Sequence, residues 1–201
     1  MKNYNPNIHH RRSMRLKGYD YAREGLYYIT LNCKERAHLF GHVVDGKMIL
    51  NPFGEIAHNE WLATEKVRDN VAIHEFVIMP DHIHGIIEIV FKKNVSVTVI
   101  GKFQSPSQTI GSIIRGYKIT VIKKIKDFIL DSSSRGELRF SPTDLDLQFS
   151  PTANEIIQLD FKIWQRDYYD HIIRNTQSYH RISKYIIDNP AKWTEKQSNK
   201  N

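Results

Sequence analysis

The chain has 201 residues and carries 29 Lys and Arg against 22 Asp and Glu, which gives a formal net charge of +7. This length suits one domain with appendages rather than two domains that fold independently. The isoelectric point near 9.4 favours an acidic partner such as nucleic acid, although charge alone would favour a merely soluble basic protein. The single cysteine, Cys33, excludes an internal disulfide, and we expect it to be a buried filler rather than a nucleophile.

No segment of the sequence has the character of a membrane span or a secretion signal. There is no run of about 18 apolar residues, so we expect no contact with a membrane. The polar and basic start of the chain lacks the apolar core of a signal peptide. We therefore expect a cytoplasmic protein.

The first predicted elements are a strand, a hairpin and a helix. Residues 26–32 are rich in β-branched and aromatic side chains, which is typical of a strand. Within 42–50, an Asp-Gly pair separates two short apolar runs and predicts a tight hairpin. From 52 to about 70, apolar residues recur every three or four positions behind a proline, which indicates an amphipathic helix.

Two further strands and a second long helix follow. Residues 71–79 and 82–90 predict adjacent antiparallel strands joined by a turn at Pro80 and Asp81. Residues 109–128 have one apolar helical face, with most basic side chains elsewhere. The order strand, helix, strand, strand, helix, strand predicts an α+β fold with a ferredoxin-like antiparallel sheet and helices packed on one face.

The composition changes between 131 and 160, where six acidic residues stand against two basic ones, with three consecutive serines and two prolines. A stretch of this kind without clear periodicity is typical of an insertion or mobile loop rather than core. Order resumes at 161–165, and a last helix is expected from about 177 to 189, ended by Pro190. We therefore expect a single domain over 1–201, with a basic N-terminal arm at 1–24 and a flexible insertion at 131–160.

His82 and His84 are the first candidate site residues. One residue separates them in a predicted strand, so both imidazoles emerge on one face while Ile83 points to the other. Two neutral imidazoles form half of a site for a divalent first-row metal. A pair of this kind is more often two surface or hydrogen-bonded histidines, so a third ligand is needed.

Tyr185 and Asn189 are the candidates for the rest of this site. They stand four residues apart on the predicted last helix and therefore share a face. Asn189 could lend its amide oxygen to the metal, and Tyr185 could then attack a polarised phosphate and form a phosphotyrosine intermediate. The pattern alone favours an ordinary amphipathic helix. Tyr179 is the rival nucleophile, but it stands six residues earlier, points in another direction and has no ligand-type residue four positions later.

Four ordered motifs resemble the REP-associated tyrosine transposases, which belong to the HUH single-tyrosine superfamily. They are HRRSMRLKGYDY at 10–21, MPDHIHGI at 79–86, WQRDYYDHIIRN at 164–175 and YIIDNPAKW at 185–193. The resemblance covers nearly the whole chain apart from 131–160. It implies a ferredoxin-like sheet that bears the His82 and His84 pair. It also implies a helix that bears the nucleophile, Tyr185, with a polar metal ligand, Asn189, one turn further on.

The basic residues are candidate DNA contacts. The N-terminal arm mixes cations with Tyr19 and Tyr21, a composition able to neutralise phosphates and stack on exposed bases. In similar transposases the N-terminal region and the second helix help to hold a DNA hairpin, which implies related roles for cations on the second helix and near 166. The predicted DNA-binding residues are Arg11, Arg12, Arg15, Lys17, Arg115, Lys118 and Arg166.

We therefore expect an enzyme that cleaves single-stranded DNA beside a hairpin, using Mg²⁺ or Mn²⁺, and acts as a monomer or a homodimer. Cleavage would leave a 5′-phosphate on Tyr185 and a free 3′-hydroxyl. Two alternatives remain open. One is a non-cutting protein, descended from a transposase, that binds structured nucleic acid, although the full set of His82, His84, Tyr185 and Asn189 argues against it. The other is a metal nuclease that activates water, with Tyr185 in a structural role.

Overall fold

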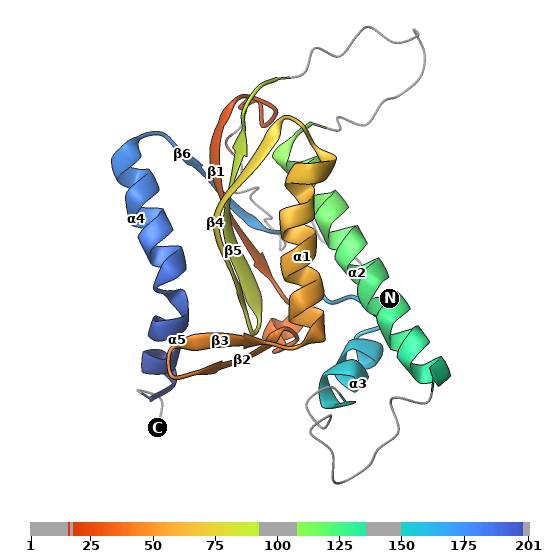
Figure 1. Cartoon of the computed structure of the whole chain (residues 1–201). Coiled ribbons are helices and arrows are strands. Elements are labelled where there is room, and N and C mark those ends of the chain that lie inside the picture. Colours follow the sequence, from red (N-terminus) through yellow and green to blue (C-terminus); the bar gives the residue numbers. More distant parts are fainter. Residues whose placement is uncertain (1–15, 17, 93–107, 136–149, 199–201) are drawn as a thin grey trace, which may run out of the picture.

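The computed structural model describes residues 16, 18–92, 108–135 and 150–198. Its elements are arranged around one four-stranded sheet (Figure 1). The strands are β1 (Gly25–Asn32), β2 (Gly41–Val44), β3 (Lys47–Leu50), β4 (Val71–Met79), β5 (His82–Ile89) and β6 (Tyr169–Ile173), and the helices are η1 (Lys34–Arg36), α1 (Pro52–Val67), α2 (Ile110–Arg135), α3 (Ser150–Gln158), α4 (Thr176–Ile187) and α5 (Asn189–Ser198).

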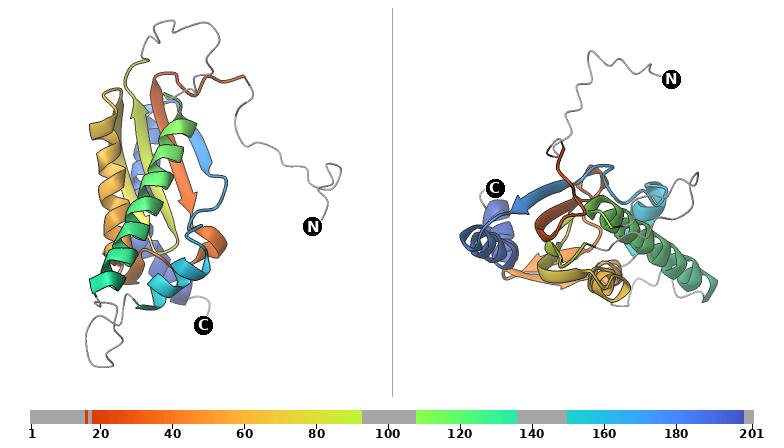
Figure 2. Two further views of the ribbon diagram at one scale, coloured as in Figure 1. Left: turned by 90° about the vertical axis from the view of Figure 1, so that its right-hand side faces the viewer. Right: turned by 90° about the horizontal axis from the view of Figure 1, so that it is seen from above.

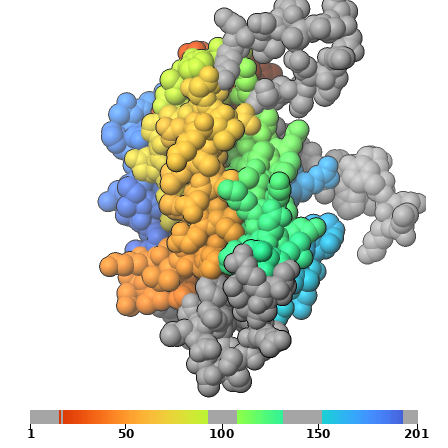
Figure 3. Space-filling model, turned by 45° about the vertical axis from the view of Figure 1, so that its right-hand side comes forward, coloured from red at the N-terminus to blue at the C-terminus, as the bar shows by residue number. Residues whose placement is uncertain are grey.

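The main sheet has the order β4-β5-β1-β6, and every neighbouring pair is antiparallel. Helices α1 and α2 cover one face, and α4 packs against β4 and β5 on the other (Figures 1 and 2). The space-filling view of Figure 3 shows α1 and α2 side by side. This strand order and the two crossover helices are those of a ferredoxin-like fold. The predicted α+β fold class is confirmed.

The core lies between the sheet and the α1 and α2 layer. In β1, Tyr27, Ile29 and Leu31 are fully buried on this side, as the alternation of a strand requires. In β5, Gly85 faces the ring of Trp61 so closely that an added Cβ would lie 2.5 Å from a ring carbon. A larger residue would push β5 away from α1 and displace the opposite face of the strand.

The predicted hairpin and first helix are both present. Asp45 and Gly46 have φ angles of 48° and 71°, as a two-residue turn with two positive φ angles requires. Strands β2 and β3 contact α5, and the Cα of Ala191 lies 3.4 Å from the Cβ position of Gly46. Helix α1 begins as expected, because the Asn51 side chain accepts a hydrogen bond from Gly54 N at 2.9 Å.

The expectation of an insertion or mobile loop at 131–160 is wrong for the described parts of that range. Helix α2 continues to Arg135, and α3 occupies Ser150–Gln158. Ala153 and Ile156 of α3 are buried in the main core. These residues are three apart on one helical face, but two apolar positions among acids give too short a pattern to detect. Residues 136–149 lie outside the described residues.

The expected end of the last helix is also wrong. Helix α4 ends at Ile187, Asp188 forms the junction, and α5 begins at Asn189. Pro190 therefore lies in the first turn of a new helix, where its missing N–H costs no hydrogen bond. Among the described helices, none is long and apolar enough to cross a membrane.

Candidate active site at the junction of β5, α4 and α5

His82 and His84 lie on the α4 face of β5. Their side chains are almost buried, each with 6% of its surface exposed, while Ile83 between them is fully buried. The two imidazole rings are 4.5 Å apart between centroids. The alternation of the strand thus brings both rings together, as the spacing predicted.

The His82 ring is oriented by a buried carboxylate. Its Nδ1 lies 2.5 Å from Oδ1 of Asp81, and Arg36 Nε contacts the other carboxylate oxygen at 2.8 Å. Arg36 and the preceding Glu35 both have left-handed backbone angles, φ 60° and 56°, a costly conformation for residues other than glycine. Since Nδ1 is engaged by Asp81, Nε2 is the nitrogen placed to bind a metal. Neither Asp81 nor Arg36 was predicted as a site residue from the sequence.

The His84 ring is held in the same way by hydroxyl groups. Its Nδ1 lies 2.7 Å from the Tyr28 hydroxyl and 2.9 Å from Thr30 Oγ1. Burial raises the pKa of Tyr28 to about 12, so this phenol stays neutral near pH 7 and acts as a hydrogen-bond partner. The Nε2 atom of His84 then faces α4, where the Tyr185 hydroxyl lies 3.4 Å away.

Tyr185 combines contact with His84 and access from solvent. Tyr185 is 39% exposed to solvent. The centre of its ring lies 5.3 Å from that of His84 and 6.5 Å from that of Tyr28. The ammonium of Lys192 lies 5.7 Å from the centre of the Tyr185 ring. A phosphate arriving from solvent can therefore reach the phenol, whose hydroxyl lies beside His84.

Asn189 does not stand on the same helix as Tyr185. It is the first residue of α5, beyond the end of α4, and is 7% exposed. Among the described residues, no three His, Cys, Asp or Glu side chains gather to hold a metal ion. A metal at His82 and His84 would therefore take further ligands from an amide, water or substrate oxygens.

Helix α5 places the aromatic ring of Trp193 beside His82, a contact that was not predicted from the sequence. The ring of Trp193 lies 5.8 Å from that of His82 and 5.6 Å from that of His38. The hairpin of β2 and β3 contacts α5 and so helps to hold Trp193 in place. The only sequence signal for this role is that Trp193 ends the last of the four motifs.

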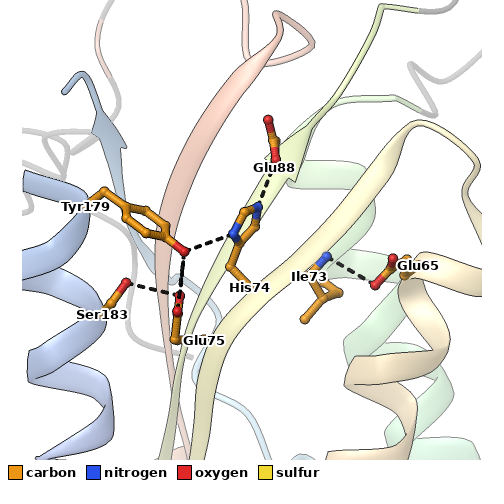
Figure 4. A network of polar contacts seen from close by, with 7 residues as sticks. All are labelled: Glu65, Ile73, His74, Glu75, Glu88, Tyr179 and Ser183. Atoms are coloured by element: carbon orange, nitrogen blue, oxygen red, sulfur yellow. Dashed lines mark hydrogen bonds and ion pairs between the residues drawn. The ribbon is translucent and has the colours of Figure 1, made fainter. Parts of the chain in front are cut away.

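Tyr179, the rival nucleophile, belongs to a separate polar network (Figure 4). Its hydroxyl donates to Glu75 Oε2 at 3.0 Å and lies 3.1 Å from Nδ1 of His74. Ser183 donates to the same oxygen of Glu75 at 3.0 Å, and His74 Nε2 contacts Glu88 at 2.8 Å. Burial and the hydrogen bond to Glu75 raise the pKa of Tyr179. This tyrosine is directed at β4 and away from His84.

A β-bulge makes this network possible. The pairing of β4 with β5 changes register between Ile73 and Phe76. Two consecutive residues of a regular strand point to opposite faces, but the bulge lets both His74 and Glu75 reach the side chains of α4 (Figure 4). Three polar contacts thereby tie α4 to β4.

No family model matches the chain. A protein of Haemophilus influenzae, described as uncharacterized, is 38% identical over 207 residues, which covers 96% of each chain. The chain belongs to the family of this protein.

Two solved structures are similar to the chain at lower sequence identity. One is a REP-associated tyrosine transposase bound to a REP hairpin, with a TM-score of 0.49, 18% identity, and coverage of 89% of this chain and 74% of the other. The other is a candidate transposase of Deinococcus radiodurans, with a TM-score of 0.41, 11% identity, and coverage of 88% and 97%.

The predicted DNA contacts have different positions. Arg11, Arg12, Arg15 and Lys17 lie outside the described residues. Arg115 is exposed on α2, which covers the face opposite α4, and Arg166 is exposed just before β6. Lys118 donates to the carbonyl oxygens of Gln165 and Asp167 at 2.7 and 3.5 Å. These hydrogen bonds tie α2 to the segment before β6, and burial lowers the pKa of Lys118 to about 8.

The aromatic residues of the N-terminal arm are part of the fold. Tyr19 and Tyr21 pack against the main core, with their rings 5.1 Å apart in an edge-to-face arrangement. The hydroxyl groups of Tyr19 and Tyr27 lie 3.3 Å apart. Tyr19 and Tyr21 are thus partly buried against the folded domain, and their stacking on DNA bases stays a prediction.

Proposed function

We propose that this protein is a tyrosine transposase that cleaves single-stranded DNA beside a hairpin and links the 5′-phosphate to Tyr185. The observation that carries the proposal is the 3.4 Å separation between the Tyr185 hydroxyl and Nε2 of His84. A solvent-accessible phenol beside two oriented imidazoles is the arrangement that nucleophilic attack on a phosphodiester needs.

The donor set fits a divalent ion. The Nδ1 atoms of His82 and His84 are both engaged by protein oxygens, so we propose their Nε2 atoms as the metal ligands. Asn189 would add an amide oxygen, and we propose Mg²⁺ or Mn²⁺ as the ion. When bound, such an ion would polarise the scissile phosphate and offset its negative charge.

In the proposed covalent step, Tyr185 is the nucleophile and the 3′-oxygen of the DNA is the leaving group. The Tyr185 oxygen forms a bond to phosphorus and loses its proton to solvent, and the bond from phosphorus to the 3′-oxygen breaks. The leaving 3′-oxygen takes up a proton and becomes a free hydroxyl. The phosphotyrosine keeps the free energy of the broken diester bond, so a 3′-hydroxyl can later attack it and rejoin the strand.

The decisive experiment uses single-stranded oligonucleotides from the DNA that flanks the gene, labelled at the 3′ end and incubated with Mn²⁺. Because the 5′-phosphate stays on the protein, the label should migrate with the denatured protein on a gel. Tyr185→Phe should lose this product, while Tyr179→Phe should keep it. Free cleaved DNA without a protein-linked product would indicate a metal nuclease that uses water, and binding without cleavage would indicate a non-cutting relative.

A further inference from the structure

Lys192 lies at the candidate active site, although the chemistry described above assigns it no role. Its ammonium is 5.7 Å from the centre of the Tyr185 ring and its side chain is 47% exposed. Among the described contacts of Tyr185, this is the one with a cation. Helix α5 carries Lys192 three residues beyond Asn189, so the backbone that places the predicted ligand also places this charge.

A weak tether holds Lys192 near the nucleophile. Its Nζ lies 3.6 Å from Oδ2 of Asp188, longer than a direct hydrogen bond. An ion pair this exposed contributes little to stability. A phosphate can therefore replace Asp188 as the partner of the ammonium at a small cost in free energy. Asp188 thus keeps the Lys192 side chain near Tyr185, while the ammonium of Lys192 can still bind another anion.

Lys184 is a natural contrast. It contacts the same Asp188 oxygen at 3.9 Å, but its side chain is 80% exposed. It stands directly before Tyr185 on α4, where successive side chains diverge by about 100°. The two lysines therefore share a partner and a charge, and they differ in whether the charge lies over the Tyr185 ring.

On the basis of the proposed function, we propose that Lys192 binds a non-bridging oxygen of the phosphate that Tyr185 attacks. His84 lies beside the Tyr185 hydroxyl, while Lys192 lies over the ring. A phosphate at the hydroxyl would therefore have the imidazole pair and the ammonium as separate neighbours. A cation placed where negative charge develops stabilises the transition state more than the ground state.

The test compares Lys192→Ala, Lys192→Arg and Lys184→Ala. The rate of protein-linked product formation in a single turnover should fall at least about tenfold in Lys192→Ala. It should recover most of this loss in Lys192→Arg and change less than about twofold in Lys184→Ala. All three proteins should keep the thermal midpoint of the wild type, because both lysines are exposed.

A second measurement does not depend on cleavage. In a Tyr185→Phe background, the affinity for a labelled single-stranded oligonucleotide is measured over a series of salt concentrations. Loss of one phosphate contact should reduce the slope of log affinity against log salt by about 0.7. Lys192→Ala should show this reduction and Lys184→Ala should not.

The outcomes separate the two proposals. If the wild type forms the adduct and the lysine variants match each other in rate and slope, the Lys192 proposal is wrong while the proposed function stands. An equal loss in Lys184→Ala would likewise overturn it, because the effect would be one of general charge. If the wild type forms no adduct, the proposed cleavage fails, and the salt slopes alone decide whether Lys192 binds phosphate.

Discussion

Tyr179 and Tyr185 stand on the same helix, α4, but the surroundings of their hydroxyl groups differ. Tyr179 is tied to Glu75 and His74 by its hydroxyl, whereas Tyr185 is 39% exposed and directs its hydroxyl to His84. The first contact fixes the helix on β4, and the second leaves an oxygen available to a substrate. One end of α4 is thus anchored on β4, and the other carries the proposed nucleophile; we call them the anchor end and the reactive end.

The largest expected effect comes from exchanging the two tyrosines for phenylalanine. Tyr185→Phe should bind DNA normally and form no protein-linked product, because only the attacking oxygen is removed. Tyr179→Phe should still form the product, since its hydroxyl contacts β4 rather than the imidazole pair. Digestion of the wild-type adduct and mass spectrometry of the modified peptide will locate the nucleotide. A nucleotide on Tyr179 would reverse the comparison.

Removal of either imidazole should also stop cleavage. His82→Ala and His84→Ala should each reduce the cleavage rate to below about one per cent of wild type, because half of the proposed ligand pair is lost. A chelator should have the same effect on the wild type, and added Mn²⁺ should reverse it. DNA affinity, measured by fluorescence anisotropy without metal, should change little. Undiminished cleavage by either variant would exclude the proposed metal site.

Local patterns in the sequence were sufficient for the fold class and for the contact between the β5 histidines and Tyr185, while the roles of these residues stay predictions. The alternation in β5 placed His82 and His84 on one face, and the four-residue spacing brought Tyr185 and Asn189 into the hypothesis. The helix boundary between Tyr185 and Asn189 was missed, because Pro190 is compatible both with an end and with a start.

The anchor end could not be predicted because it depends on tertiary structure. The bulge that turns both His74 and Glu75 towards α4 has no signature in a run of β-forming residues. The contact of Arg36 with Asp81 similarly depends on a left-handed loop far from β5 in the sequence. The burial of Ile156 in α3 depends on long-range packing that its own acidic segment does not reveal.

A smaller effect on the reactive end should follow from Asp81→Asn. The amide keeps the size of the side chain but cannot supply the charge that orients His82 and pairs with Arg36. Loss of such a partner behind a ligand typically lowers metal affinity or activity by about 10- to 100-fold. Titration of cleavage activity with Mn²⁺ should therefore show a shift to higher metal concentration. An unchanged titration would mean that Asp81 stabilises only the loop.

The smallest effect is expected at the anchor end, in Glu75→Gln, and it should depend on pH. Burial raises the pKa of Glu75, but hydrogen bonds from its own backbone N–H and from the Tyr179 and Ser183 hydroxyl groups outweigh this effect and lower the pKa. A carboxylate whose pKa is lower in the folded state stabilises the fold above its unfolded pKa, 4.5 in the reference state, and this contribution is lost as the pH falls through the folded value.

Urea unfolding at neutral pH should therefore show a loss of about 1 kcal/mol in Glu75→Gln, and the difference from wild type should shrink on the acid side of 4.5. Glu65→Gln is the matched control, because Glu65 is exposed on α1 and accepts a single hydrogen bond from Ile73 N at 3.3 Å. It should change stability less and without this pH dependence. A difference that grows towards acid pH would show that Glu75 is held protonated, and the anchor would then have to be a neutral hydrogen-bonded pair instead of a carboxylate that accepts from two hydroxyl groups.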